Sequence, residues 1–270
     1  MYNPVLLSHY HQLVKRLSFM VKRKAPVLKD AWITVVDPVL NPVAPHSISR
    51  HYLIWDGREG PEAPLVVAFH GGHGSAEVMA NDYLIPRGGY VVAYPSGSNK
   101  GPFASSPIRV SGDNLSWNTS SPYEVGQGWA GEAGVNDDLF ITTLVTALKA
   151  QFNCNKAFVV GVSRGGMMAF HYACTTNLFS AMATVATTIL DPLPVTRIPD
   201  IHVHGTADPQ VCWDVWQDSC APWPKAKPLV SSWQASGSHE LHVIPNGVHA
   251  WSPNGVFDTT GAIWNFLSNK

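Results

Sequence analysis

The sequence predicts an α/β fold with a mainly parallel eight-stranded sheet flanked by helices. Short runs rich in β-branched and aromatic residues recur along the chain, and stretches with helical periodicity lie between them. The middle runs are continuously apolar, as expected of strands that are buried on both faces of a parallel sheet. Strands that alternate with helices favour parallel pairing through right-handed crossovers.

The eight predicted strands begin with two that precede any strand–helix unit and are expected to pair with each other. The strands are predicted at 31–36, 51–55, 65–69, 90–94, 157–160, 182–187, 201–203 and 241–244. Helices are predicted at 137–152, where Asn136 is the expected N-cap, directly after Ser163, and at 262–267. An early strand pair followed by strand–helix units is the arrangement of an α/β-hydrolase fold.

Composition limits the function classes. The chain has 270 residues, of which 45% are hydrophobic and 14% charged, enough for one large core and too apolar for wholesale disorder. The formal net charge of -1 argues against the positive field with which proteins hold nucleic acid. Apolar runs such as 183–190 stop short of a membrane span. A monomer without a nucleic-acid partner or membrane span is the default expectation.

The N-terminal segment differs from the rest of the chain. Residues 1–30 are predicted to form an extension with a basic amphipathic helix around 13–21, and residues 31–270 a single catalytic domain. Basic residues follow the apolar opening, whereas a signal peptide has the reverse order. The expected protein is therefore either intracellular or the mature form of a secreted one.

The four cysteines lack metal-type spacing, which argues against a zinc module. Cys154 and Cys174 fall in segments with a core pattern and are expected to be buried thiols. Cys212 and Cys220 bracket one short loop, and whether they form a disulfide stays open at this stage.

Two long stretches interrupt the alternation of strands and helices: 101–134 is rich in Gly, Ser, Pro and Asn with little periodicity, and 209–238 is rich in Pro and Trp. Loops of this length in a compact domain usually serve function, so these are expected to form the walls of a substrate cleft. The tryptophans predicted to contact substrate are Trp117, Trp129, Trp213 and Trp251. The alternative is that these indoles fill irregular loop packing.

The strongest local signal is the pattern G-x-S-x-G at 161–165, directly after the strand predicted at 157–160. A strand that turns abruptly into a helix presents the Ser163 hydroxyl at the edge of the sheet, and the helix directs its positive end toward a developing oxyanion. An incidental serine in such a turn is the alternative. The buried-type strand before it and the helix after it favour Ser163 as a nucleophile.

A serine nucleophile requires a base, and in this fold the chain order is Ser, then Asp or Glu, then His. His249 follows the last predicted strand and a turn, which makes it the expected base. His239 and His242 lie nearer to or inside that strand and are expected to be structural. His204 precedes the acid, which is the wrong order for the base.

The expected acid is Asp208, which follows the strand predicted at 201–203 and would hold the base in the correct tautomer. A carboxylate before proline also fits a turn-capping role. Three rival carboxylates, Asp191, Asp214 and Asp218, follow a strand less closely.

An oxyanion hole is expected in the glycine-rich segment 70–75, after the strand predicted at 65–69. Either Gly72 or His73 would supply one backbone N–H, and the Arg164 N–H the second. A phosphate-binding function of these glycines is disfavoured, because neither G-K-[ST] nor G-x-G-x-x-G is present.

From about residue 50 onward, the chain resembles the polyhydroxybutyrate-depolymerase and feruloyl-esterase group of α/β-hydrolases, the LpqC-like esterases. The matching segments are His70-Gly71, Val135-Asn136-Asp137, Gly161-Val162-Ser163-Arg164-Gly165-Gly166, His204-Gly205-Thr206-Ala207-Asp208 and Gly247-Val248-His249-Ala250-Trp251. The resemblance implies a serine esterase without a cofactor, acting on hydroxyalkanoate polymers or hydroxycinnamoyl esters. It also implies the same triad, with Trp251 beside the site.

The sequence departs from the family pattern at three places. Arg164 stands where the family commonly has a small or amide residue, Asn136 replaces an aspartate, and Asn246-Gly247-Val248 replaces three glycines. Arg164 would favour an ester that carries a carboxylate.

The sequence thus predicts a carboxylic-ester hydrolase that works through an acyl-enzyme. A peptidase or thioesterase on the same triad is the second hypothesis. A catalytically silent α/β-hydrolase that serves as a binding module is the third.

Overall fold

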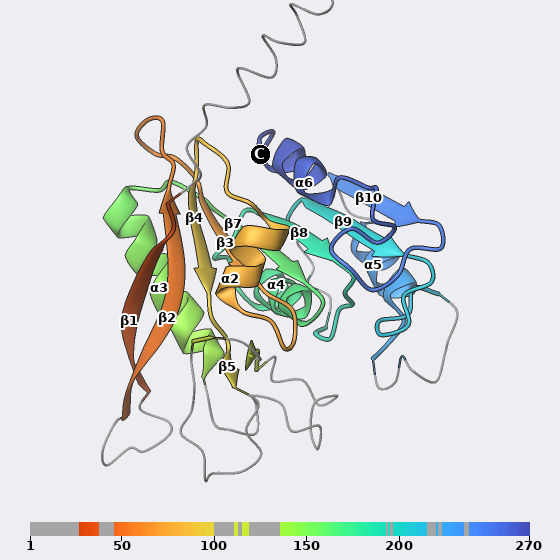
Figure 1. Cartoon of the computed structure of the whole chain (residues 1–270), viewed down its shortest axis with the longest axis horizontal. Helices are drawn as coiled ribbons and strands as arrows, with labels where there is room; N and C mark the ends of the chain where they lie inside the picture. The colour runs from red at the N-terminus through yellow and green to blue at the C-terminus, as the bar shows by residue number, and fades with distance from the viewer. Residues whose placement is uncertain are drawn as a thin grey trace, which may run out of the picture.

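A computed structural model describes residues 27–37, 46–99, 111–112, 115–118, 136–192, 194, 197–214, 220, 223–234 and 238–270. Its main feature is an eight-stranded sheet in the order β1-β2-β4-β3-β7-β8-β9-β10, seen from β1 to β10 in Figure 1. The bounds are β1 Lys29–Asp37, β2 His46–Asp56, β3 Leu65–Phe69, β4 Val91–Pro95, β7 Ala157–Val162, β8 Ala181–Val185, β9 Asp200–Gly205 and β10 His239–Ile244. The predicted eight-stranded sheet is confirmed.

The sheet is mainly parallel, as predicted. β1 pairs with β2, and β2 with β4, in antiparallel register, whereas the pairs from β4 to β10 are parallel. Each residue of β3, β4, β7, β8 and β9 is buried. The chain turns from β3 to β4 and later returns to the other side of β3 as β7. A ligand cleft is expected where the strand order reverses, at the carboxyl ends of β3 and β7.

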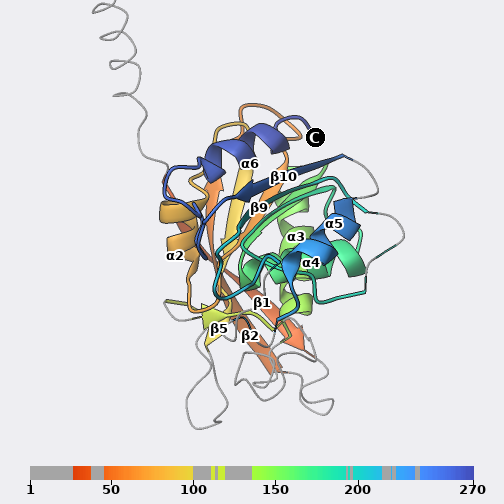
Figure 2. The same cartoon turned by 90° about the vertical axis from the view of Figure 1, so that its right-hand side faces the viewer.

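Helices cover both faces of the sheet, as Figure 2 shows. One face carries α2 (Ala76–Val78), the π-helical turn η1 (Met79–Tyr83) and α6 (Thr259–Leu267). The other carries α3 (Asp137–Phe152), α4 (Arg164–Thr175) and α5 (Ala226–Gln234). Two hydrophobic cores result, one on each side of the strands.

Helix α3 has the bounds predicted from the sequence because its ends are strongly marked. The Asn136 side chain accepts a hydrogen bond from the Leu139 N–H at 2.9 Å. The helix ends at Asn153 in the left-handed conformation (φ 53°). At the first turn, the Asp137 carboxylate accepts a 2.6 Å hydrogen bond from Arg50 Nη2 on β2, and both groups are buried. This ion pair joins α3 to the sheet.

The stretch 209–238 was predicted as an irregular loop, and the structure corrects this in part, because it contains α5. Pro228 and the surrounding tryptophans suggest a loop, yet proline is tolerated in the first turn of a helix. Ala226, Val230 and Trp233 recur at helical spacing and are fully buried.

Parts of the prediction fall on residues that the structure does not describe. These are residues 1–26 of the N-terminal extension and most of 101–134, where the small pair β5 (Ser98–Asn99) and β6 (Leu115–Ser116) borders the gap. Within the described ranges, every helix is too short or too polar to span a bilayer.

Candidate active site

Ser163 lies in the turn between β7 and α4, as predicted. Its backbone has φ 52° and ψ -119°, a strained conformation for a residue other than glycine. The Ser163 N–H donates to the Val185 carbonyl on β8 at 2.8 Å. The turn is thus held against the neighbouring strand and presents the hydroxyl at the carboxyl end of β7.

The two glycines of the G-x-S-x-G pattern are required by close backbone approaches. A Cβ on Gly161 would lie 2.1 Å from the Gly165 carbonyl oxygen. A Cβ on Gly165 would lie 2.4 Å from the carbonyl oxygens of both Phe69 and His70. The turn therefore packs directly on the segment that follows β3, which brings Ser163 next to the glycine-rich loop.

The structure brings Ser163, His249 and Asp208 together in one chain of hydrogen bonds. His249 Nε2 lies 2.9 Å from Ser163 Oγ, and His249 Nδ1 lies 2.7 Å from Asp208 Oδ2. Asp208 is buried, and its Oδ1 accepts the backbone N–H groups of Gln210 and Val211, each at 2.8 Å. Asp208 and His249 follow β9 and β10, so all three residues lie at the carboxyl edge of the sheet.

The surroundings of Asp208 keep it ionised. Burial raises the pKa of the carboxyl group, but the hydrogen bonds with His204 and His249 and the backbone N–H of Val211 outweigh burial and hold the pKa well below its usual range. At neutral pH a charged carboxylate therefore faces His249.

His70, the first residue of the glycine-rich loop, is a neutral structural group. Burial lowers its pKa to about 4. Its Nδ1 lies 2.7 Å from the Gly71 carbonyl, which only accepts, so the ring proton is on Nδ1. The bare Nε2 accepts the Gly97 N–H at 3.0 Å. The ring therefore fixes the loop by two backbone contacts.

The competing histidines and aspartates lie outside the hydrogen-bonded chain of Ser163, His249 and Asp208. His239 and His242 lie within β10, where His239 pairs with Asp200. His204 lies behind Asp208 on β9. Among the other carboxylates, Asp191 pairs with His171 and Asp214 pairs with Lys227, whereas Asp218 lies outside the described residues.

Two cavities meet at Ser163 and share four lining residues, Gly72, His73, Ser163 and Gln210. The first cavity, of about 290 Å³, extends past His249. It is also lined by His70, Gly71, Gly74, Val78, Tyr83, Val162, His249, Ala250 and Trp251. The second, of about 200 Å³, is also lined by Arg164, Met167, Val211 and Trp223.

The three residues predicted for an oxyanion hole all line the second cavity. Gly72 and His73 line both cavities, and His73 has a positive φ of 61°. Arg164 begins α4 directly after Ser163. Its side chain is buried rather than solvated, and the guanidinium lies 5.2 Å from the centre of the Trp223 ring in the second cavity.

Of the tryptophans predicted to contact substrate, Trp251 lines the first cavity. Its ring stacks on Tyr83 with centroids 5.4 Å apart and planes 7° apart, and its Nε1 donates to Thr260 Oγ1 at 3.0 Å. These contacts make a rigid aromatic wall.

Trp117 and Trp213 line neither cavity, so the structure does not place them where they were predicted to contact substrate. Trp117 is fully buried, packs on Phe69 and donates its Nε1 hydrogen to the His70 carbonyl at 2.8 Å. Trp213 packs on the ring of His204 with centroids 5.1 Å apart. Both therefore pack against histidines next to the site, Trp117 against His70 and Trp213 against His204. Trp129 lies outside the described residues.

The sequence-based site prediction did not include several cavity residues, among them Tyr83, Met167, Gln210 and Trp223. Gln210 had the clearest available signal, because it lies two positions after the predicted acid. The others are placed by packing, for which the sequence holds no local pattern.

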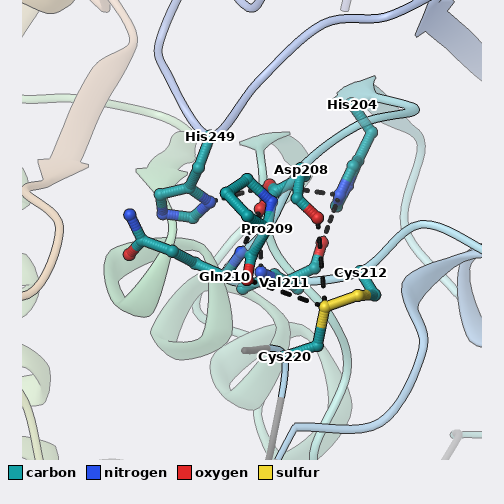
Figure 3. The surroundings of a disulfide bond; sticks show 8 residues. All are labelled: His204, Asp208, Pro209, Gln210, Val211, Cys212, Cys220 and His249. Atoms are coloured by element: carbon teal, nitrogen blue, oxygen red, sulfur yellow. Dashed lines mark hydrogen bonds and ion pairs between the residues drawn. A yellow bond between two sulfur atoms is a disulfide. The ribbon is translucent and has the colours of Figure 1, made fainter. Parts of the chain in front are cut away.

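The question of the Cys212–Cys220 disulfide is settled, since the two are bonded with Cα atoms 5.5 Å apart. Figure 3 shows the bond below the loop that follows Asp208, with Cys220 Sγ near the Asp208 and Pro209 carbonyls. Cys154 is a buried thiol as predicted, whereas Cys174 is only partly buried. The described residues contain no group of three or more His, Cys, Asp or Glu side chains that could hold a metal ion.

No protein-family model and no curated protein matches the chain. Solved structures do match. A cold-adapted esterase from an Arctic intertidal metagenomic library has a TM-score of 0.56 at 13% identity, over 92% of this chain and 96% of that one. The peroxisomal α/β-hydrolase Lpx1 of Saccharomyces cerevisiae has a TM-score of 0.56 at 11% identity, over 92% and 91%. An acylaminoacyl peptidase of Pyrococcus horikoshii has a TM-score of 0.56 at 13% identity, over 92% of this chain and 41% of that one.

The chain has the α/β-hydrolase fold. At these identities the likeness establishes the fold alone. In this α/β-hydrolase fold the residues follow β7, β9 and β10 in the order Ser, Asp, His, which is the order that the sequence predicted.

Proposed function

We propose that this chain hydrolyses carboxylic esters through an acyl-enzyme on Ser163. The observation that carries the proposal is the position of His249, which bridges Ser163 Oγ at 2.9 Å and Asp208 Oδ2 at 2.7 Å. A serine hydroxyl becomes nucleophilic when a base accepts its proton in this geometry.

The reaction has two halves. Ser163 Oγ attacks the ester carbonyl while its proton passes to His249 Nε2, and Asp208 stabilises the imidazolium. The oxyanion is held by the backbone N–H groups of Arg164 and of Gly72 or His73. His249 then returns the proton to the leaving alcohol. In the second half, His249 accepts a proton from water, which attacks the acyl-enzyme carbonyl. The bond to Ser163 Oγ then breaks, His249 returns the proton to Ser163 Oγ, and the acid is released.

The path of the proton indicates which half of the ester occupies each cavity. The leaving alcohol takes its proton from His249, which lines the first cavity and not the second. The alcohol half of the substrate therefore occupies the first cavity, along Trp251, and the acyl half occupies the second, between Met167 and Trp223.

The aromatic lining supports a feruloyl-type acyl group or a hydroxyalkanoate polyester as substrate. Trp223 offers an aromatic face to a planar acyl group, and Arg164 lies beside it to favour an ester that carries a carboxylate. The proposal includes membership of the depolymerase and feruloyl-esterase group, which the sequence resembles. Solved structures with the same fold include proteins named as esterases and as acylaminoacyl peptidases.

Ester hydrolysis is tested with p-nitrophenyl acetate, methyl ferulate and a hydroxybutyrate oligomer, each with wild type and Ser163→Ala. The variant is expected to lose several orders of magnitude in turnover while keeping its fold. Turnover that persists in folded Ser163→Ala contradicts the mechanism. Preference for methyl ferulate or for the oligomer decides between the two substrate classes.

Matched ester, thioester and amide substrates separate an esterase from a thioesterase or a peptidase. Labelling of Ser163 by an organophosphonate distinguishes all three from a silent binding module, because such a module would not react. The expected result is rapid labelling with hydrolysis of the ester alone among the three.

A further inference from the structure

Behind Asp208, on the side away from His249, lies a chain of buried polar groups that the proposed reaction does not use. His202 and His204 alternate along β9, point to the same face and are fully buried. Thr184 Oγ1 lies 2.7 Å from His202 Nδ1, and His202 Nε2 lies 3.0 Å from His204 Nδ1. His204 Nε2 lies 2.8 Å from the Val211 carbonyl and 3.4 Å from Asp208 Oδ2 (Figure 3).

The Val211 carbonyl, at the end of this series of hydrogen bonds, determines which ring nitrogens of His202 and His204 carry a hydrogen. The Val211 carbonyl only accepts hydrogen bonds, so His204 Nε2 carries a hydrogen. With one ring proton on His204, its Nδ1 is bare and accepts from His202 Nε2–H. The bare His202 Nδ1 then accepts from the Thr184 hydroxyl. Every donor in the chain points toward Asp208.

A second proton on His202, the inner member of the histidine pair, is disfavoured by its surroundings. Burial and the neighbouring His204 hold the pKa of His202 well below its usual range. The rings of Trp213 and Phe170 pack on the pair. Asp208 is the one carboxylate in contact with it among the described residues.

The contacts of His204 bear on both oxygens of the acid. Oδ1 is held by the N–H groups of Gln210 and Val211, and the Val211 carbonyl is held by His204. Oδ2 faces His249 Nδ1 on one side and the His204 N–H on the other. A change at His204 therefore affects both the loop that holds Oδ1 and the electron density on Oδ2.

We propose that His204 is a positioning residue for Asp208. It donates its Nε2 hydrogen to the Val211 carbonyl and toward Asp208 Oδ2, and Thr184 and His202 fix that tautomer. Asp208 is thereby kept with Oδ2 directed at His249. The inference rests on the proposed ester hydrolysis, in which Asp208 acts through His249.

Two substitutions at His204 test this. His204→Gln retains an N–H donor near the Nε2 position, whereas His204→Leu removes the donor and keeps a similar apolar volume. His204→Leu is expected to lower kcat for p-nitrophenyl acetate by about ten- to a hundredfold with little change in KM, and His204→Gln to restore most of it.

The pH profile distinguishes positioning from general damage. In His204→Leu, Oδ2 loses a competing donor and binds protonated His249 more strongly. The acidic limb of kcat/KM is therefore expected to move to higher pH by about half a unit, and to return in His204→Gln. Leu148→Ala, in the core of α3 far from the site, is the control, because it lowers stability without moving the limb. An unmoved limb and wild-type kcat in His204→Leu would overturn the proposal.

Imidazole ¹⁵N NMR on the wild type determines the tautomers of His202 and His204 independently of any catalytic activity. The expected result is that both His202 and His204 carry their ring hydrogen on Nε2. A hydrogen on His204 Nδ1 at neutral pH would overturn the assignment. If the wild type cleaves no ester, the proposed function fails, while the tautomer assignment still stands or falls on this spectrum.

Thr184→Val provides a second variant in case His204→Leu does not fold. It removes the hydroxyl donor at the far end of the chain and leaves Asp208 and His249 untouched. A mixture of His202 tautomers and a two- to tenfold loss of kcat, at roughly the scale of an outer hydrogen bond, is expected. Wild-type tautomers and kcat in this variant would show that the chain has no positioning role.

Discussion

Asp208 fixes the position of Gln210. The Gln210 backbone N–H donates to Asp208 Oδ1 at 2.8 Å, and the Gln210 side chain lies in the wall of both cavities. The residue that orients the base therefore also places a neutral polar group at the junction of the two halves of the cleft.

The first prediction concerns the charge at this junction. Gln210→Glu places a carboxylate near the point where the oxyanion forms, and like charges there raise the barrier. We expect kcat/KM for p-nitrophenyl acetate to fall about tenfold, which corresponds to about 1.4 kcal/mol. In Gln210→Met, whose side chain has a similar shape and no charge, kcat/KM should fall much less. Equal losses in the two variants would show that shape matters here rather than charge.

The second prediction concerns the buried ion pair between Arg50 and Asp137. Either partner alone would be an uncompensated buried charge, so Arg50→Met and Asp137→Leu are each expected to lower the free energy of unfolding by about 3–5 kcal/mol. The double variant should recover a large part of that loss. Urea unfolding of all four proteins measures the coupling, and strictly additive losses would contradict it.

The third prediction is a pH dependence of stability. Burial alone would lower the pKa of His171, but its hydrogen bonds with Asp138 and Asp191 outweigh burial and raise the pKa to about 10. Because the folded pKa lies above the unfolded value of about 6.5, the stabilisation is complete below pH 6.5 and is lost as the pH rises toward 10. The stability difference between wild type and His171→Asn should therefore be larger at about pH 6 than at about pH 10.5. A difference that stays constant with pH would contradict this account.

The fourth prediction concerns the disulfide. Cys212 and Cys220 close a loop with a sequence separation of 8, for which chain entropy gives about 2.5 kcal/mol of stabilisation. The Cys212→Ser/Cys220→Ser variant should lose stability of this order and also kcat, because Cys220 Sγ packs against the backbone carbonyls of Asp208 and Pro209. Cys174→Ser is the control, since that thiol is free and only partly buried. Thermal unfolding and ester turnover of both variants check the prediction.

Sequence patterns predicted the sheet well because its local signals are strong. β3 was predicted with its observed bounds, since a proline precedes its continuous apolar run and the glycine-rich segment 70–75 follows it. β8 was predicted to extend to residue 187 but ends at Val185, because Ala186 adopts φ 48° and leaves the extended conformation. That turn depends on the neighbouring backbone of Ser163 and β9, which no local pattern encodes.

The candidate triad was predictable because chain order and strand ends constrain it, whereas the cavity walls were not. Trp117 and Trp251 look alike in sequence, each in a loop-like segment, yet one is buried beneath His70 and the other lines the first cavity. Which indole faces a cavity depends on how distant segments pack. Tyr83, for example, stacks on Trp251 although the two residues are far apart in the sequence.

The separation of Ser163 and His249 by 86 positions has a kinetic consequence. A folding chain that has formed β7 and α4 already has the nucleophile turn, but it lacks a base until β9 and β10 have docked at the far edge of the sheet. Such non-local pairing is slow to form. Reactivity of Ser163 with an organophosphonate should therefore return later in refolding than the helical signal, and its appearance would time the last step of assembly.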